Sequence, residues 1–353
     1  MINLLGFALY GPLAASHRYR LGQYVPGLRE HGIELHVCHL LCDRYLRSLV
    51  DGSQMPWLNL TYAGFTRLYD LVRSRRFDVA MLHCELFPML PGWIERAILP
   101  RPYIYDFDDA FYLKYQRQKF GLVQPLLAHK FDTVMAGAAA ITAGNSALAT
   151  YARQHNSNTH ILPTVVDTER YVPAARPPNV SFTVGWIGSP STAPYLCEIV
   201  EALSVVGKEG SVRLVVIGGK APSIPHVTVS ELPWCENTEV PLINSFDVGL
   251  MPLPDDDWAR GKCAFKLIQY MACGVAVIAS RVGANIDVVQ PDCGRLVSGT
   301  DEWVQALRQL RDNVTMRQQM GEAGRARVEQ HYSLRRNLPL LAQTVRAAVE
   351  GGQ

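Results

Sequence analysis

Apolar residues along this chain alternate between short continuous runs and longer stretches in which they recur every three or four positions. The short runs are typical of buried parallel strands, and the longer stretches are typical of helices that cover a sheet. The N-terminal half predicts strands at 3–9, 33–41, 77–82, 103–106, 139–142 and 160–162, with helices at 20–31, 43–49, 61–74 and 147–155. The C-terminal half predicts strands at 182–187, 212–217, 227–229, 247–251, 275–279 and 295–297, with helices at 193–206 and 265–272. From 301 onward the pattern is helical, with turns near 321–324 and 331–333.

The two series are separated by a stretch, 163–178, that holds four prolines and no hydrophobic period. Such a stretch is typical of a linker. Repeated alternation of strand and helix predicts an α/β protein with two doubly wound parallel-sheet domains. We expect an N-terminal domain over 1–163, a linker over 164–180 and a C-terminal domain over 181–333. Ligands of such sheets bind outside the carboxyl ends of the strands, so we expect a site in a cleft where the two domains face each other.

Composition narrows the class of protein. The chain has 353 residues, of which 48% are hydrophobic, and a net charge of only +2. This balance is that of a soluble two-domain protein, and it disfavours a nucleic-acid binder that depends on bulk positive charge. The eight cysteines contain no C-x-x-C pair, which favours reduced thiols in a cytoplasmic protein over a zinc site or disulfides.

Two stretches without charge, 1–17 and 133–152, are too interrupted by glycine and polar residues to cross a membrane. The basic run 73–76 permits contact with the surface of a membrane at its inner face, although cations are equally favourable at an ordinary helix end.

The first candidate site is the turn after the strand at 182–187. Gly188 and the hydroxyls of Ser189, Ser191 and Thr192 stand where a helix opens, a place at which backbone N–H groups can hold a phosphate. An ordinary strand-to-helix turn is the alternative.

A second candidate is a group of cations that precede or open the apolar helix 265–272. Arg260, Lys262 and Lys266 could neutralise a diphosphate leaving group. The last two are four residues apart, which would place them on one helix face. A solvated basic edge is the alternative.

The N-terminal half offers polar groups at strand ends. His83 follows the strand at 77–82, with Glu85 two residues later, and could donate a hydrogen bond to a substrate; a structural histidine is the alternative. Asp106, Asp108 and Asp109 could hold a metal, an acceptor hydroxyl or a helix N-terminus.

A further group lies after the turn of the first strand. Ser16 and Arg18 could bind an acidic or sugar substrate, with an exposed helix start as the alternative.

Three motifs carry a resemblance to a known family. Met271-Ala272-Cys273-Gly274 is followed by Val277-Ile278-Ala279-Ser280, Ile161 to Thr168 reads ILPTVVDT, and Ala143 to Ser146 reads AGNS. The chain resembles the retaining glycosyltransferases of the GT-B fold, glycosyltransferase family four or "group 1". The resemblance implies a nucleotide-sugar donor on the C-terminal domain, an acceptor on the N-terminal domain, and a last helix, about 334–353, that packs back onto the latter.

The resemblance also assigns roles to residues. It implies that His83 faces the transferred sugar, and that Lys266 and Arg260 meet the diphosphate. On the donor side it implies Gly188, Ser189, Ser191, Thr192, Gly218, Trp234, Lys262, Ala264, Phe265 and Gln269. For the acceptor we expect Ser16, Arg18, Glu85, Asp106 and Asp108. The family's Glu-x7-Glu pair is absent, because Gly261 and Gln269 stand at its two positions, and Gln269 could still bind the ribose hydroxyls of the donor.

We therefore expect a retaining glycosyltransferase that acts on a carbohydrate or lipid-linked acceptor in glycan, polysaccharide or glycolipid synthesis, without a cofactor or a required metal. Absence of both glutamates leaves open a catalytically silent sugar-nucleotide-binding subunit. A sugar-nucleotide epimerase of the same architecture and a metal-dependent enzyme built on Asp106, Asp108 and Asp109 are further alternatives.

Overall fold

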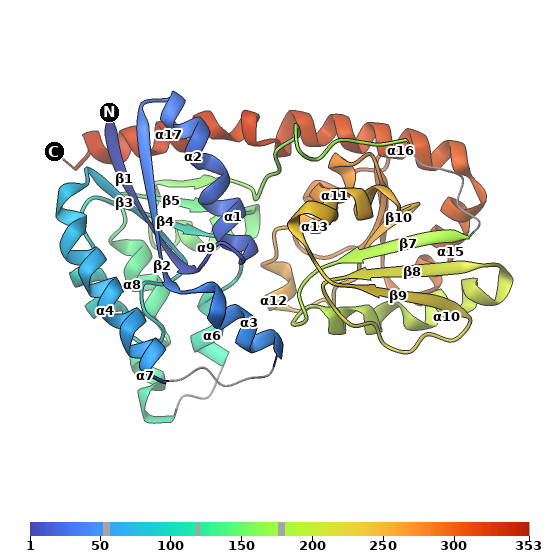
Figure 1. Ribbon diagram of the computed structural model, residues 1–353, viewed down its shortest axis with the longest axis horizontal. Helices are drawn as coiled ribbons and strands as arrows, with labels where there is room; N and C mark the ends of the chain where they lie inside the picture. The colour runs from blue at the N-terminus through green and yellow to red at the C-terminus, as the bar shows by residue number, and fades with distance from the viewer. Residues whose placement is uncertain (52–56, 118–120, 176–180, 353) are drawn as a thin grey trace. The chain divides into compact units, whose positions relative to one another are not determined.

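The computed structural model describes residues 1–51, 57–117, 121–175 and 181–352 (Figure 1). Its contacts divide the chain into two compact units. Unit 1 comprises Met1–Thr164 and Asn337–Gln353, and unit 2 comprises Val165–Arg336. Each unit is built on one parallel sheet, so the predicted fold class is confirmed.

The sheet of unit 1 has six strands in the order β2-β1-β3-β4-β5-β6. The strands are β1 (Ile2–Tyr10), β2 (Ile33–Leu41), β3 (Val79–His83), β4 (Tyr103–Phe107), β5 (Ala140–Ala143) and β6 (Thr159–Ile161). Every residue of β3, β4 and β5 is buried, which explains their continuous apolar runs. The register pairs His83 at the end of β3 with Asp106 of β4. The buried centre of the sheet therefore delivers two polar residues side by side at its carboxyl edge.

The helices of unit 1 connect these strands. They are α1 (Ala15–Arg20), α2 (Val25–Glu30), α3 (Asp43–Asp51), α4 (Trp57–Arg73), α5 (Gly92–Ile98), α6 (Tyr112–Arg117), α7 (Gln124–Leu127), α8 (Lys130–Ala136) and α9 (Ser146–Arg153). The last helix of the chain, α17 (Leu334–Glu350), belongs to unit 1 from Asn337 onward. Leu338 of α17 packs so closely on Gly27 that a Cβ at Gly27 would lie 2.5 Å from its Cδ2, and Arg346 donates to the carbonyl of His31.

The sheet of unit 2 has six parallel strands in the order β12-β11-β10-β7-β8-β9. They are β7 (Phe182–Ile187), β8 (Val212–Ile217), β9 (Val227–Leu232), β10 (Val248–Met251), β11 (Ala276–Ser280) and β12 (Gly294–Val297). The chain first builds outward from β7 to β9 and then returns to pair β10 with the other side of β7. This reversal is the topological switch point at which ligands of such sheets bind.

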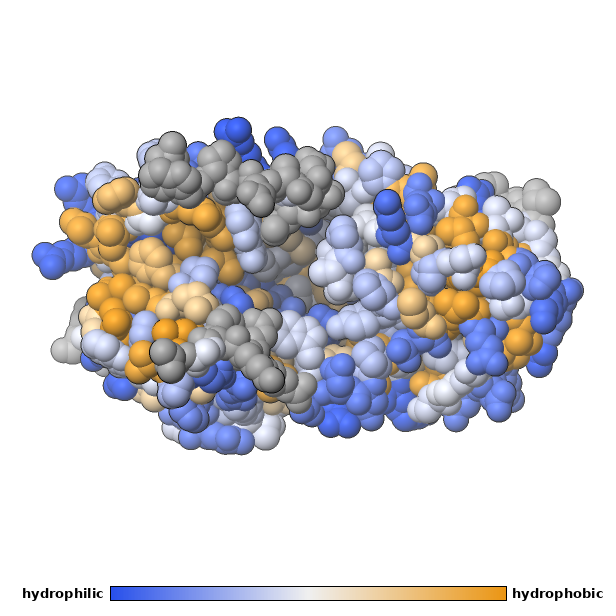
Figure 2. Space-filling model, turned by 90° about the horizontal axis from the view of Figure 1, so that it is seen from below, coloured by the Kyte–Doolittle hydropathy of each residue, from blue (hydrophilic) through white to orange (hydrophobic). Residues whose placement is uncertain are grey.

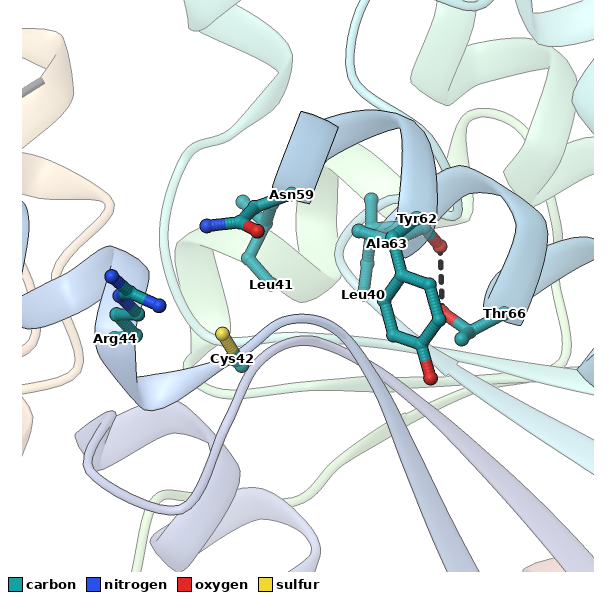
Figure 3. Close-up of a pocket in the computed structure, with 8 residues that line it drawn as sticks. All are labelled: Leu40, Leu41, Cys42, Arg44, Asn59, Tyr62, Ala63 and Thr66. Atoms are coloured by element: carbon teal, nitrogen blue, oxygen red, sulfur yellow. Dashed lines mark hydrogen bonds between the residues drawn. The ribbon is translucent and has the colours of Figure 1, made fainter. Parts of the chain in front are cut away.

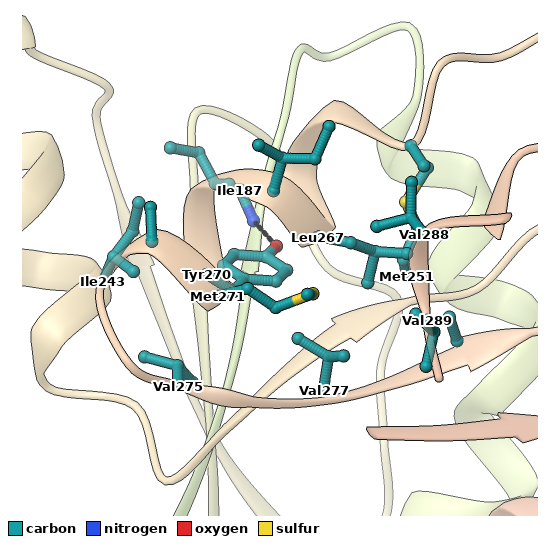
Figure 4. Packing of buried hydrophobic residues seen from close by; sticks show 14 of the residues in the cluster. Ile187, Ile243, Met251, Leu267, Tyr270, Met271, Val275, Val277, Val288 and Val289 are labelled. Carbon is teal, nitrogen blue, oxygen red and sulfur yellow. Dashed lines mark hydrogen bonds between the residues drawn. The ribbon is translucent and has the colours of Figure 1, made fainter. Parts of the chain in front are cut away.

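Helices and a packed core surround this sheet. The helices are α10 (Val200–Glu209), α11 (Glu236–Asn244), α12 (Asp257–Arg260), α13 (Phe265–Ala272), α14 (Asn285–Val288), α15 (Gly299–Asp312) and α16 (Val314–Arg327). Figure 4 shows α13 laid on the core, where the hydroxyl oxygen of Tyr270 accepts a hydrogen bond of 2.9 Å from the backbone N–H of Ile187. The same ring packs on Gly249 of β10, where a Cβ would lie 2.3 Å from it. Packing thus fixes α13 to the ends of β7 and β10.

Two predicted helices and one predicted turn differ from the structure. The segment 20–31 is broken between α1 and α2 by a 3₁₀ turn at Gly22–Tyr24, and α2 begins at Val25 with Pro26 in its first turn. The segment 193–206 begins as a 3₁₀ helix, Ala193–Ile199, before α10. The turn predicted at 321–324 is wrong, because α16 runs through it. A Cβ at Gly321 would lie 2.1 Å from the carbonyl oxygen of Gly274, so glycine serves close packing there.

None of the helices in the described residues is both long enough and apolar enough to span a membrane. All eight cysteines are described, and none forms a disulfide.

Candidate functional site

Two glycines at strand ends form the centre of the candidate site in unit 2. Gly218 follows β8 in a left-handed conformation, with φ +78°, and a Cβ there would lie 2.4 Å from the carbonyl oxygen of Gly188. The same Cβ would lie 3.1 Å from Cβ of Trp234. The turns after β7, β8 and β9 therefore meet, and the absence of side chains at both glycines allows this approach.

Lys266 joins this cluster from α13. Its ammonium nitrogen lies 5.3 Å from the centre of the Trp186 ring, and a Cβ at Gly188 would lie 2.8 Å from its Cε. The aliphatic part of the side chain thus runs beside the Gly188 turn. A partly buried cation held next to a glycine turn is suited to a diphosphate.

Hydroxyl groups line the turn beyond Gly188. Oγ of Ser189 lies 2.8 Å from Oγ of Ser191 and 3.4 Å from Oγ1 of Thr192, so the three predicted hydroxyls do lie together. The helix that follows is the 3₁₀ segment Ala193–Ile199. The predicted contribution of an α-helix N-terminus is therefore missing at this turn.

The N-terminus of α13 supplies an α-helix start instead. Ala264 precedes it in a left-handed conformation, with φ 54°, which is unusual for a residue with a side chain. Ala264 is buried and Phe265 is half-buried. The positive end of the helix dipole thus lies next to Lys266, which adds to the attraction for an anion.

The other two predicted cations are placed differently from Lys266. Lys262 precedes α13, so the prediction that it shares a helix face with Lys266 is wrong; its Nζ lies about 6 Å from the rings of Trp258 and Tyr195. Arg260 is exposed and forms ion pairs with Asp255 and Asp257, at 2.8 and 3.2 Å. Asp255, Asp256 and Asp257 thus place negative charge next to the predicted cations.

Gln269 lies on the buried side of α13 in a polar network that the sequence did not predict. Its Nε2 lies 2.9 Å from the hydroxyl of Tyr171 and 3.1 Å from Oε1 of Glu239. Tyr171 also donates to Oε1 of Glu239, and Nε1 of Trp234 donates to Oε2. One buried carboxylate therefore links two predicted donor residues, Gln269 and Trp234.

In unit 1 the central group is His83. Its Nδ1 lies 2.8 Å from Oδ2 of Asp106, and both side chains are buried. Asp106 also receives both Nε and Nη2 of Arg20, and the hydroxyl of Thr142 at 2.6 Å. Burial would raise the pKa of Asp106, but the charge of Arg20 and the hydrogen bonds from His83 and Arg20 outweigh it and hold the pKa well below its usual range.

The other imidazole nitrogen of His83 faces a thiol and a second carboxylate. Nε2 lies 3.2 Å from Sγ of Cys84 and 3.8 Å from an oxygen of Asp108. These three ligand atoms lie within 4.8 Å of one another, an arrangement that could hold a thiophilic divalent metal. Burial and the nearby Asp108 raise the pKa of the Cys84 thiol well above its usual value. Asp108 is the most exposed of the trio, with 18% of its side chain accessible.

Glu85, predicted to meet an acceptor, is fully buried behind this edge of the sheet. Its carboxylate accepts hydrogen bonds of 2.8 Å from Lys114, Lys130 and Tyr115. Burial raises the pKa of Glu85, but the two lysines lower it further, so the net shift is downward. Neither Glu85 nor Asp106 is exposed to solvent, so Asp108 is the carboxylate among the three acidic acceptor candidates that a ligand can reach.

Ser16 and Arg18 lie on α1, beyond β1. Both are half-buried, and Arg18 donates to the backbone carbonyls of Pro12 and Leu13 at 3.1 and 2.6 Å. Arg18 thus stabilises the turn after β1. Arg20, at the end of the same helix, holds Asp106 and also donates to the carbonyl of Leu162 at 2.8 Å.

A separate cavity of about 220 Å³ opens elsewhere in unit 1 (Figure 3). It lies between the end of β2 and α4 and is lined by Leu40, Leu41, Cys42, Arg44, Asn59, Tyr62, Ala63 and Thr66. None of the predicted site residues lines it.

Comparison with known proteins shows which proteins this chain is similar to. Residues 181–313 match the family model described as "Glycosyl transferases group 1". No curated protein matches the chain in sequence. The resemblance is confirmed at the level of the group 1 match over 181–313 and of the GT-B fold, which solved structures of glycosyltransferases share over 98% or more of this chain.

Among these structures is sucrose-phosphate synthase from Thermosynechococcus elongatus, with a TM-score of 0.71 and 14% identity over 99% of this chain and 100% of that one. Anabaena HepE in complex with UDP-glucose gives a TM-score of 0.71 and 13% identity over 98% of this chain and 100% of that one. The lipopolysaccharide outer core galactosyltransferase WaaB gives 0.65 and 10% identity over the full length of both. The chain therefore has the GT-B fold.

Proposed function

We propose that this GT-B-fold chain is a retaining glycosyltransferase that moves a sugar from a nucleoside-diphosphate sugar to an acceptor hydroxyl. One observation carries the proposal. Lys266 runs beside the glycine turn Gly188 at the switch point of unit 2, where the positive end of α13 also lies. These groups form a cationic cradle of the kind a diphosphate needs, and the same segment lies within the family match.

Binding of the donor follows from this cradle. The diphosphate meets Lys266, the backbone at Ala264 and Phe265, and the hydroxyls beyond Gly188. The nucleoside lies toward Gly218, Trp234 and Gln269, whose turns converge on Gly188. Lys262 adds positive charge next to the diphosphate. The charge of Arg260 is largely balanced by its ion pairs with Asp255 and Asp257.

In the transfer step, the bond between the anomeric carbon and the diphosphate oxygen breaks, and a bond to the acceptor oxygen forms on the same face of the sugar. The acceptor proton passes to the departing phosphate oxygen. Lys266 stabilises the charge that grows on this leaving group, so no cofactor and no required metal enters the proposal. Retention rests on the resemblance of 161–168 and 271–280 to the retaining family.

In unit 1, His83 and Asp108 are the proposed contacts of the sugar and the acceptor. Asp106 and Glu85 are proposed as positioning residues, because both carboxylates are buried and form ion pairs with Arg20 and with Lys114 and Lys130, respectively. Asp106 fixes Nδ1 of His83, so Nε2 is the nitrogen directed at Cys84 and Asp108.

The surface of unit 1 favours an acceptor at a membrane surface. Large apolar side chains on α4 are exposed, among them Phe65 at 72% and Tyr69 at 67%. Figure 2 shows hydrophobic residues gathered on the surface of unit 1. The helix ends in exposed Arg73, and Arg75 and Arg76 follow, so cations flank this face. Aromatic rings next to basic residues are typical of proteins that bind anionic lipid surfaces, which supports a lipid-linked acceptor.

A panel of nucleoside diphosphates tests the donor site. UDP, GDP, ADP and dTDP are added separately, and the melting temperature is recorded. A specific ligand should raise it by mass action. The corresponding nucleotide sugar should then be consumed in the presence of glycan or lipid acceptors, with the anomeric configuration of the product read by NMR.

The alternatives give other results in the same assay. Binding without turnover by the wild type would indicate a silent subunit, which the absence of the two glutamates favours. An epimer formed without acceptor would indicate an epimerase. No shift with any nucleotide would overturn the donor site.

A further inference from the structure

A buried carboxylate in unit 2 organises two residues of the proposed donor site. Glu239 lies on α11 and is 1% exposed. Its Oε2 accepts from the indole N–H of Trp234, and its Oε1 accepts from the hydroxyl of Tyr171 and from Nε2 of Gln269. The three donors come from three separate parts of the chain, so this network is built by the fold.

The network determines which end of the Gln269 amide faces outward. An ionised carboxylate can only accept hydrogen bonds, and an amide nitrogen can only donate. With the amide reversed, its oxygen would face Oε1 of Glu239 across 3.1 Å, and two acceptors would repel. Glu239 therefore holds the NH₂ group of Gln269 inward.

The amide oxygen of Gln269 is left for a ligand. Within the described residues, Nε2 makes both hydrogen bonds of this side chain, and Oε1 accepts none, although the residue is only 4% exposed. Oε1 is not among the buried polar atoms that are sealed from solvent without a partner. An acceptor atom is thus presented at an almost closed surface beside Lys266 on the same helix.

We propose that Glu239 is a positioning residue that fixes the Gln269 amide so that its oxygen accepts a hydrogen bond from a ribose hydroxyl of the donor nucleotide. This inference rests on the proposed function. The oxygen of the Gln269 amide, held in place by the Glu239 carboxylate, would then accept the hydrogen bond of the ribose at a position that has no carboxylate of its own. The same carboxylate holds Trp234 beside Gly218, so one buried group orders both neighbours of the nucleoside.

Affinity measurements with UDP and with 2′,3′-dideoxy-UDP test this role. Glu239→Gln is nearly isosteric and can still accept from Trp234, but its own NH₂ group would face Gln269 and reverse that amide. UDP affinity should fall about three- to tenfold, the usual range for one hydrogen bond. The affinity for 2′,3′-dideoxy-UDP should stay the same, because this ligand lacks the hydroxyl.

Exchanging the two side chains at positions 239 and 269 should restore the affinity for UDP. Gln269→Glu alone would bring two carboxylates together and should weaken UDP binding. In the double variant Glu239→Gln, Gln269→Glu, the new amide donates to the new carboxylate, which can accept from the ribose. UDP affinity and the preference for UDP over the dideoxy analogue should therefore return. Glu236→Gln, a change at an exposed residue of the same helix, is the matched control and should bind as the wild type does.

The outcomes separate this inference from the proposed function. A wild type that no nucleoside diphosphate of the panel stabilises would overturn the proposed function and this inference with it, and a wild type that prefers another base is tested with that diphosphate and its 2′,3′-dideoxy form. A wild type that binds UDP, with folded Glu239→Gln protein of equal affinity or with equal losses for both ligands, would overturn the role of Glu239. Failure of the double variant to recover would do the same.

Discussion

Nδ1 of His83 lies 2.8 Å from Oδ2 of Asp106, a carboxylate that is also paired with the guanidinium of Arg20. Because the Asp106 carboxylate can only accept, Nδ1 donates to it, and Nε2 is the nitrogen directed at Cys84 and Asp108. The pairing therefore fixes which nitrogen of His83 faces the candidate site.

Asp106→Asn should destabilise the protein strongly. The change leaves the buried Arg20 without its counter-charge, and breaking a buried ion pair from one side typically costs about 3–5 kcal/mol. Urea unfolding at pH 7 measures the loss. Glu34→Gln is the control, because its partner Arg29 is 67% exposed, and the urea midpoint should change little. Equal midpoints for the two variants would contradict the structural role of the Arg20–Asp106 pair.

Lys266→Gln should impair transfer more than folding. The variant keeps a polar side chain, one bond shorter than lysine, but removes the charge beside Gly188, and loss of one group that stabilises a developing anion typically lowers kcat by about 10²–10³-fold. Kinetics with a saturating nucleotide sugar measure this. Lys208→Gln, at an exposed site at the end of α10, should retain wild-type kcat. A Lys266 variant with wild-type kcat would remove this residue from the mechanism.

Gly218→Ala should disrupt the convergence of the donor-site turns. The added Cβ would lie 2.4 Å from the carbonyl oxygen of Gly188, in a backbone conformation that L side chains rarely adopt. We expect a lower melting temperature and no stabilisation by nucleotide. Gly210→Ala serves as its partner variant, since a Cβ there meets nothing within 4 Å. Undiminished nucleotide stabilisation in Gly218→Ala would contradict the placement of the donor.

Stability should depend on pH through Glu95. Burial raises the pKa of this carboxyl from 4.5 to about 6, despite Lys130 at 2.9 Å. The folded state thus holds the proton more tightly than the unfolded state, so the stability it contributes is present below pH 4.5 and is lost as pH rises through about 6.

The variant Glu95→Gln isolates this effect. The unfolding free energy of the wild type minus that of Glu95→Gln should fall between pH 4.5 and pH 7, by on the order of 2 kcal/mol. Urea titrations at the two pH values measure it. A difference that is constant or rises with pH would show that the Glu95 pKa is not raised.

Exposed rings on α4 should bind anionic membranes. The double variant Phe65→Ser, Tyr69→Ser should reduce co-sedimentation with phosphatidylglycerol vesicles severalfold, and high salt should weaken binding of the wild type by screening the arginines. Ile286→Ser removes an exposed apolar residue from unit 2 and is the comparison. Equal sedimentation of all three proteins would exclude α4 as the contact.

The sequence could predict the sheets because buried parallel strands are continuously apolar. The bounds of β7 and β8 agree with the predicted 182–187 and 212–217, and α13 agrees with 265–272. The helices α5, α6 and α11, of 6 to 9 residues, were not predicted from the apolar pattern, and α11 contains Pro241, a residue that argues against a helix interior. The 3₁₀ start at Ala193–Ile199 has no periodic signal at all.

Residues of the candidate site could be predicted only where neighbouring residues in the chain identify them. Gly188, Lys266 and His83 stand at predicted strand or helix ends, which is where ligands of parallel sheets bind. Glu239 gave no such signal, because its importance comes from Tyr171, Trp234 and Gln269, which only the fold brings to it. A partner 98 residues away in the chain, as Tyr171 is from Gln269, cannot be found from spacing.

The return of α17 to unit 1 after Asn337 means that the two units are interleaved in the chain. A fragment ending at Thr164 would lack the face of α17 formed by Leu338, Leu341, Ala342 and Val345, all of which are buried in the intact chain. No single cut can therefore release unit 1 in complete form. Co-expression of two pieces, or a circular permutation that joins 337–353 directly to Met1, is the route by which this unit can be obtained alone.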